Sequence, residues 1–352
     1  MIEVENMKIV KIDKESLVKG MERLAGTYKL FGPVEEKGYH NFRPLQKGEL
    51  PDLAYANTKL SVKSTLFPQS EVMFQYSLDE TKEDHHILKE VKKDYSPRAV
   101  IGMRPCDAKA TMLVKLNFDT PDYKDPFWLK SYQATTFVGF ACDNPAPTCF
   151  CTSANCGPYH EEGLDVLLIN LDGSYGAKAI TEKGEALLDH AGWTEPMDGA
   201  LVEKKKQAAE NKIRSSVSTD RLREKGTLDL HTAPFWDDVG FGCLNCGTCT
   251  FACPTCWCFD IQDETKNKQG IRMKNWDSCM FPEFTLHTTG HNPRGTKIQR
   301  VRQRFMHKLK YFVDKYEQGI MCVGCGRCVR QCPVNIDIRS ICDKMNGYEP
   351  AV

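Results

Sequence analysis

The sequence predicts an α/β N-terminal domain followed by a smaller, mainly α-helical C-terminal domain. The chain has 352 residues, which corresponds to about two domains at roughly 150 residues each. Strand-like and helix-length segments alternate in the first part of the chain, and two similar cysteine-rich runs lie in the last part. We therefore expect an α/β domain over residues 1–215, a polar linker over 216–235 and the helical domain over 236–352.

Three apolar segments predict the strands of the first domain. Residues 99–103, 135–140 and 166–171 are short, rich in β-branched and aromatic residues, and followed by turn-forming sequences. Residues 108–118 have the length of a helix between the first two strands. Residues 71–76 are a further extended segment. Strands that alternate with helices are typical of an α/β sheet.

Composition excludes several classes of protein. Lys+Arg and Asp+Glu both number 47, so the formal net charge is zero and gives no general attraction to nucleic acid. No apolar run is long enough to span a membrane, and the N-terminal residues lack the apolar core of a signal peptide. We expect a cytoplasmic protein. In that reducing compartment, its 17 cysteines are better interpreted as metal ligands than as disulfides.

Residues 243–254 and 322–333 repeat one motif, CxxCxxCxxxCP. A [4Fe–4S] cube needs four thiolates, and three thiolates at this spacing can surround it from one compact loop. In paired runs of this kind the fourth cysteine ligates the other cluster. We therefore predict two clusters. Their ligands are Cys243, Cys246, Cys249 and Cys332 for cluster 1, and Cys322, Cys325, Cys328 and Cys253 for cluster 2. Zinc sites with separated CxxC pairs fit this pattern less well.

A possible further centre lies in the first domain. Cys106 and Cys142 directly follow two predicted strands, and the carboxyl ends of strands are where α/β sheets bind ligands. Three more thiols follow closely, so that the set is Cys106, Cys142, Cys149, Cys151 and Cys156. Their spacing matches no standard motif. The alternative is that some of them are ordinary buried cysteines.

The 68 residues between Cys253 and Cys322, 254–321, are expected to be helical, because Val301, Phe305, Leu309 and Phe312 recur at helical spacing. The basic residues of this stretch indicate either a solvated helix face or a cationic docking face for an acidic partner. Three less certain ligands also lie here, either for a further centre or as thiols that hydrogen-bond to a cluster. They are Cys256, Cys258 and Cys279. Cys342 is expected to be a buried helix residue.

From residue 100 to the end, the chain resembles the iron–sulfur beta subunits of cytosolic sulfhydrogenases and the related iron–sulfur subunit of anaerobic sulfite reductase. The resemblance is carried by the two cysteine runs and by RPCD (104–107), PTCFC (147–151), CPTC (253–256), WDSC (276–279) and HNPR (291–294). The long segment between the runs is similar to the α-helical ferredoxin domain of succinate dehydrogenase iron–sulfur subunits. Cys156 departs from the family pattern, which puts its role as a ligand in doubt.

The resemblance implies an electron-transfer subunit of an anaerobic oxidoreductase complex. It implies two partners, a flavin-containing, NAD(P)H-linked subunit and a catalytic redox subunit of the hydrogenase, sulfite reductase or heterodisulfide reductase type. The sequence itself has no GxGxxG, GxSxG, HExxH or P-loop motif, so we predict no catalytic residue. The alternative is that the chain is itself a reductase, with a non-standard cluster or a flavin in the N-terminal domain. A cluster-based redox sensor that binds nucleic acid is a third reading, and the zero net charge weighs against it.

Overall fold

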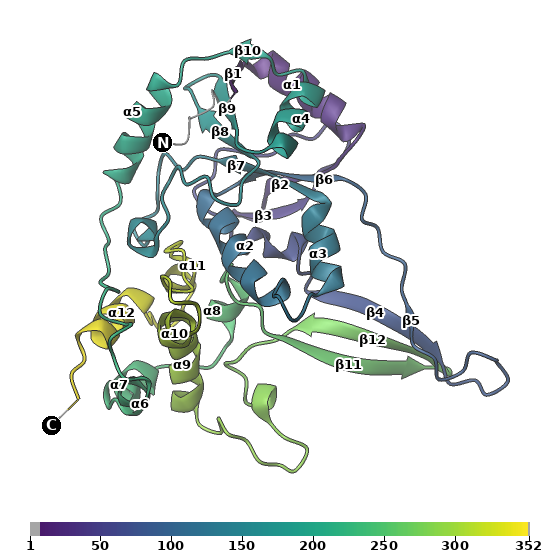
Figure 1. The fold of residues 1–352 in the computed structure, drawn as a ribbon, viewed down its shortest axis with the longest axis vertical. Coiled ribbons are helices and arrows are strands. Elements are labelled where there is room, and N and C mark those ends of the chain that lie inside the picture. Colours follow the sequence, from purple (N-terminus) through teal and green to yellow (C-terminus); the bar gives the residue numbers. More distant parts are fainter. Residues whose placement is uncertain (1–7, 351–352) are drawn as a thin grey trace.

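A large mixed sheet forms the first part of the molecule (Figure 1). The computed structural model describes residues 8–350. The strand order in this sheet is β10-β1-β9-β8-β7-β6-β2-β3, and β2, β6, β7 and β8 run parallel. The strands are β1 (Ile9–Ile12), β2 (Lys29–Glu36), β3 (Tyr39–Pro44), β6 (Arg98–Met103), β7 (Thr135–Phe140), β8 (Val166–Asn170), β9 (Tyr175–Ala179) and β10 (Glu195–Pro196). The predicted α/β architecture is thus confirmed.

Helices cover both faces of this sheet (Figure 1). On one face α1 (Lys14–Ala25) and α4 (Glu182–Ala191) pack over side chains such as Ile101 and Val138. On the other face α2 (Pro105–Phe118) and α3 (Pro126–Gln133) pack over the alternate side chains, such as Val100. Neighbouring strand residues therefore belong to opposite cores, which explains why the central strands are apolar throughout.

A second, four-stranded sheet joins the two halves of the sequence. Its order is β11-β12-β4-β5, all antiparallel. The strands are β4 (Ser70–Ser77), β5 (Lys89–Glu90), β11 (Phe259–Lys266) and β12 (Gln269–Trp276). The wholly helical connection predicted between the cysteine runs is therefore wrong over 259–276. Asn267 and Lys268 both have positive φ, 49° and 60°, as a two-residue hairpin turn requires.

Helix α5 (Ala200–Glu210) lies beside the large sheet, near β8 and β9 (Figure 1). The remaining helices pack around the cysteine runs below this sheet (Figure 1). They are α6 (Thr227–Thr232), α7 (Phe235–Phe241), α8 (Thr248–Phe251), α9 (Lys297–Met306), α10 (Phe312–Tyr316), α11 (Arg327–Arg330) and α12 (Ile338–Gly347). Short 3-10 turns are η1 (Val62–Thr65), η2 (Cys151–Ala154) and η3 (Pro282–Thr285), and η4 (His307–Tyr311) is a π-helical segment.

Helices α9, η4 and α10 form one continuous rod that crosses the core of the C-terminal part. Its predicted apolar face is buried, with Val301 and Leu309 at 1% and 0% exposure. The segment 216–235 contains α6, and its Leu222 and Leu230 are fully buried in the same core. Among residues 8–350, no helix has the length and apolar character needed to cross a membrane.

Candidate metal centres

The first cysteine run folds into a tight loop at the start of α8. Gly247 caps this helix with φ +72°, and a Cβ there would lie 2.7 Å from the Phe281 ring, so only glycine fits. The loop brings Cys243, Cys246 and Cys249 to one cavity. That cavity is bordered on its other side by Cys332 and Cys328 of the second run.

The second run forms a matching loop at the start of α11. Gly324 and Gly326 have φ of +61° and +69°. A second cavity is lined by Cys322, Cys325 and Cys328, together with Cys253 from the end of the first run. Each run thus contributes its fourth cysteine to the cavity of the other run, which is the arrangement that the paired motif predicts.

The spacing of the thiols disfavours single zinc ions. Tetrahedral zinc with Zn–S bonds of about 2.3 Å holds its sulfur atoms roughly 3.8 Å apart. No three cysteines of the described chain have all their sulfur atoms within 4.8 Å of one another; the one such group of potential ligands there is Glu35, His40 and Asp52. Thiols spread around a cavity fit a larger inorganic group better than one ion.

Two cations from the helical rod border these cavities. Arg304 and Lys308 are each 3% exposed, and neither forms an ion pair with a carboxylate among residues 8–350. Arg304 borders both cavities and Lys308 borders the second. Burial would lower the pKa of Lys308, but the surrounding thiolates of Cys253 and Cys256 outweigh it and raise that pKa. Isolated buried cations are costly, so these side chains fit an anionic group such as a thiolate-bound [4Fe–4S] cluster.

The basic residues of the rod do not form one exposed face. Four of them, Arg300, Arg304, Lys308 and Lys310, are buried. Arg300 donates to the backbone oxygens of Met280, Arg294 and Gly295, and Lys310 pairs with Asp314. The expectation of a solvated or docking face is therefore wrong for these four. The sequence did hold a signal, because these cations follow the same helical period as the buried apolar residues.

The five N-terminal thiols lie beside the loop of the second run. Cys106 is the second residue of α2, and the remaining four lie between the end of β7 and the residues just after η2. The Cys149 thiol is 3.6 Å from the Cys325 carbonyl oxygen, and the Phe150 N–H donates to the Gly324 oxygen over 2.9 Å. Burial raises the pKa of Cys156 to about 12. The segment 149–156 is thus packed against the second cavity.

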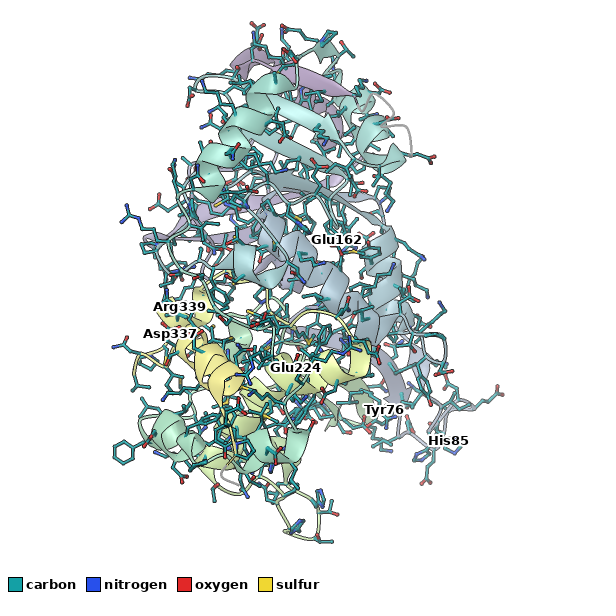
Figure 2. The ribbon with its side chains drawn as sticks, turned by 60° about the vertical axis from the view of Figure 1, so that its left-hand side comes forward. Tyr76, His85, Glu162, Glu224, Asp337 and Arg339 are labelled. Carbon is teal, nitrogen blue, oxygen red and sulfur yellow. The ribbon has the colours of Figure 1, made fainter. Side chains whose placement is uncertain are left out.

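An ion pair and hydrogen bonds also connect α12 to the segment that carries the N-terminal thiols. Arg339 and Asp337, both labelled in Figure 2, pair at the start of α12. The Arg339 guanidinium also donates to the Ser215 hydroxyl over 2.6 Å and lies 3.5 Å from the Pro147 oxygen. One side chain therefore holds α12 to the loop that carries the N-terminal thiols.

Cys256, Cys258 and Cys279 lie at the base of the β11–β12 hairpin and border a third cavity, of about 280 Å³. Hydrogen bonding between the thiols of Cys258 and Cys279 lowers the pKa of Cys258 to about 7. A similar bond between the thiols of Cys253 and Cys256 lowers the pKa of Cys253. The thiols of this cavity thus include one neighbouring pair, Cys258 and Cys279, and one thiol, Cys256, that neighbours a residue of the second cavity.

His307 borders the third cavity and was not singled out from the sequence. It begins the π-helical segment, and its ring lies 6.2 Å from the ring of Trp257. Burial and the nearby Lys308 lower the pKa of His307 to about 4. A histidine among several charged helix residues carries no pattern that would have marked it.

Comparison with known proteins defines the class first. Residues 242–336, which contain both cysteine runs, match the family model described as a 4Fe-4S dicluster domain. A relative then extends the likeness to nearly the whole chain. The chain is 27% identical over 348 residues to sulfhydrogenase 2 subunit beta of Pyrococcus furiosus. The alignment covers 96% of this chain and 98% of the relative. The predicted resemblance to sulfhydrogenase beta subunits is confirmed. No solved structure matches the chain.

Proposed function

We propose that this chain is the iron–sulfur electron-transfer subunit of a multi-subunit oxidoreductase. The observation that carries the proposal is the exchange of fourth cysteines between the two runs, which places eight thiols around two adjoining cavities. When bound, a [4Fe–4S] cluster supplies one-electron oxidation and reduction. Apart from the thiols, the residues that line the first and second cavities include no group of side chains with the ligand chemistry of a metal or cofactor site.

The proposed cluster ligands are the cysteines that line each cavity. The first cluster would be held by Cys243, Cys246, Cys249 and Cys332, and the second cluster by Cys322, Cys325, Cys328 and Cys253. Thr255 supports the second set, because its hydroxyl lies 3.3 Å from the Cys253 sulfur and donates to the Met321 oxygen over 2.9 Å. The C-terminal part would then be an α-helical two-cluster domain with an inserted hairpin.

Arg304 supports electron exchange between the two centres. Its side chain borders both cavities, so the two proposed clusters would be close neighbours. The Arg304 Nη2 donor reaches the Cys249 oxygen over 3.2 Å, while Nε has no hydrogen-bond partner among residues 8–350. The positive charge of Arg304 would stabilise the reduced form of either proposed cluster.

The first centre is the better candidate for contact with a partner. Cys246 is exposed, and the neighbouring Leu244 and Phe241 are 65% and 81% exposed. Large apolar side chains beside an exposed ligand favour a docking site. Because the relative is a beta subunit by name, we infer that this chain also belongs to a multi-subunit complex. The family resemblance leads us to propose a flavin-containing, NAD(P)H-linked subunit and a catalytic redox subunit as its partners. The many free thiols favour a reducing, cytoplasmic location.

The five N-terminal thiols remain a proposed site for a further cluster. The contacts of Cys149 with the Cys325 oxygen and of the Phe150 N–H with the Gly324 oxygen support it, because a centre there would adjoin the second one. Its ligands would come from Cys106, Cys142, Cys149 and Cys151, with Cys156 as the fifth thiol nearby.

Iron and acid-labile sulfide analysis of the anaerobically purified chain tests the proposal, with EPR after dithionite reduction. Two cubes require about eight irons per chain. The Cys246→Ala and Cys325→Ala variants should each lose or convert one cluster signal. The proposal fails if the wild-type chain binds zinc instead, or if neither variant changes the iron content or the EPR spectrum.

A further inference from the structure

We propose that Cys256, Cys258, Cys279 and His307 ligate an additional iron–sulfur cluster in the third cavity. This inference rests on the proposed function, because an isolated cluster without the first two would have no electron path. It concerns residues outside both CxxCxxCxxxCP motifs. Cysteine and histidine together are known ligands of iron–sulfur centres.

The hairpin places the thiols. Phe259 and Trp276 are the first cross-strand pair of β11 and β12, and the Asp277 N–H donates to the Cys258 oxygen over 3.0 Å just outside it. Cys258 and Cys279 therefore approach each other across the base of the hairpin. Cys279 is 8% exposed.

The cavity contains donors that lack partners. Arg304 Nε and the indole N–H of Trp257 are buried and have no hydrogen-bond partner among residues 8–350, and both side chains border this cavity. Leaving such buried donors without an acceptor is unfavourable. Cluster sulfides and thiolates are acceptors that would satisfy them.

The charge of the lining has the sign that a thiolate-bound cluster needs. Arg304 and Lys308 border this cavity as well as the second one. Lys63 is not a lining residue, but its ammonium donates to the oxygen of the lining residue Cys256 over 3.0 Å and lies 4.2 Å from the centre of the Trp276 ring. None of these three cations pairs with a carboxylate of the described residues.

The π-helical segment supplies the imidazole. Residues His307–Tyr311 depart from α-helical hydrogen bonding, and such segments frequently occur at functional sites. The departure begins at the two residues, His307 and Lys308, that border the cavity. In a regular α-helix the residues that follow this segment would point in different directions around the helix axis. The π-helical segment therefore changes which side chains face the cavity.

Shared lining residues set the place of the new centre. Thr255, Arg304 and Lys308 border both the second and the third cavity, and Cys253, a proposed ligand of the second cluster, lies two residues before Thr255. The additional centre would therefore adjoin the second one. The result is a branch of the electron path that ends at a solvent-connected cavity.

Metal analysis of single-residue variants of the full chain tests the inference. Cys258→Ala and Cys279→Ala should each lose one cluster's worth of iron, about four per chain for a cube, and keep the EPR signals of the two motif clusters. Cys342→Ala is the matched control, since this thiol is also buried but borders none of the three cavities. Unchanged iron in both variants would overturn the inference, as would a Cys258–Cys279 disulfide in the anaerobic protein.

The ligand role of His307 has its own readout. Pulsed EPR of protein labelled with ¹⁵N-histidine should show a nitrogen coupling that disappears in His307→Cys, while the iron content is retained. The reduction potential of that signal should fall, because imidazole ligation gives higher potentials than thiolate ligation. Wild-type protein without a histidine coupling would contradict the role of His307. Loss of iron in Cys325→Ala but not in Cys258→Ala would reject this centre and leave the proposed function intact.

Discussion

Arg327 and Asp107 form a bidentate ion pair whose two side chains are both 0% exposed. The Arg327 Nη2 lies 2.7 Å from an Asp107 oxygen, and Nε donates to the Thr58 backbone oxygen over 3.0 Å. Arg327 stands between Cys325 and Cys328, and Asp107 follows Cys106 at the start of α2. The pair therefore joins the second cysteine run to the α/β sheet at the point where the N-terminal thiols also lie.

Removing one partner of this pair should destabilise the whole chain. Asp107→Asn leaves a buried, uncompensated guanidinium, which costs about 3–5 kcal/mol. We expect the melting temperature of the holo-protein to fall by roughly 6–10 °C, together with partial loss of the second cluster. Asp122→Asn is the control because Asp122 is exposed. Equal melting temperatures for the two variants would show that the pair contributes nothing to the junction.

Neutralising Lys308 should make the neighbouring clusters harder to reduce. A unit charge about 8 Å away at an effective dielectric constant of about 20 contributes about 2 kcal/mol, which is roughly 90 mV for a one-electron couple. Lys308→Met should therefore lower the midpoint potential of at least one cluster in an EPR-monitored titration. Lys315→Met removes an exposed lysine further along the same rod and should leave the potentials unchanged. A rise in potential for Lys308→Met would refute the electrostatic role.

The strands of the α/β part and the eight motif cysteines could be predicted because each carries a local pattern. Residues 135–140 are rich in β-branched and aromatic residues and form β7 with the predicted bounds. The exchange of Cys253 and Cys332 between the runs follows from known motif chemistry, and the cavities support it.

The remaining features depend on contacts between distant segments. The residues of β11 are almost all exposed, so no apolar alternation marks this strand, and its partner β12 pairs in turn with β4, about 200 residues earlier. The burial of Arg304 and Lys308 was indicated only by their helical period, which is a weak signal for a different reason. Charged helix residues are usually solvated, and only a buried anionic group reverses that preference.

The apolar surface beside the first cavity should bind a partner subunit. Leu244→Asp places a charge next to exposed Cys246 and should weaken complex formation or electron transfer from the partner by about 10-fold or more, as expected for a central interface residue. The EPR spectrum of the isolated chain should not change. Leu228→Asp is the matched control, since Leu228 is 72% exposed but borders none of the three cavities. An equal effect of both variants would argue against a docking site at Leu244.

The close approach of Gly324 to the N-terminal thiols should make this glycine essential for the second cluster. A Cβ at Gly324 would lie 2.5 Å from the Cys151 backbone nitrogen, and φ is +61°. Gly324→Ala therefore combines backbone strain of about 1–2 kcal/mol with a clash that neither backbone segment can relieve alone. Gly48→Ala tests the backbone strain alone, because φ is +79° there and nothing lies within 4 Å of the added Cβ. We expect Gly48→Ala to keep its full iron content with a small loss of stability, and Gly324→Ala to lose iron from the second cluster. If both variants keep their iron, the contact between the Gly324 loop and the segment 149–156 does not control how the second cluster is held.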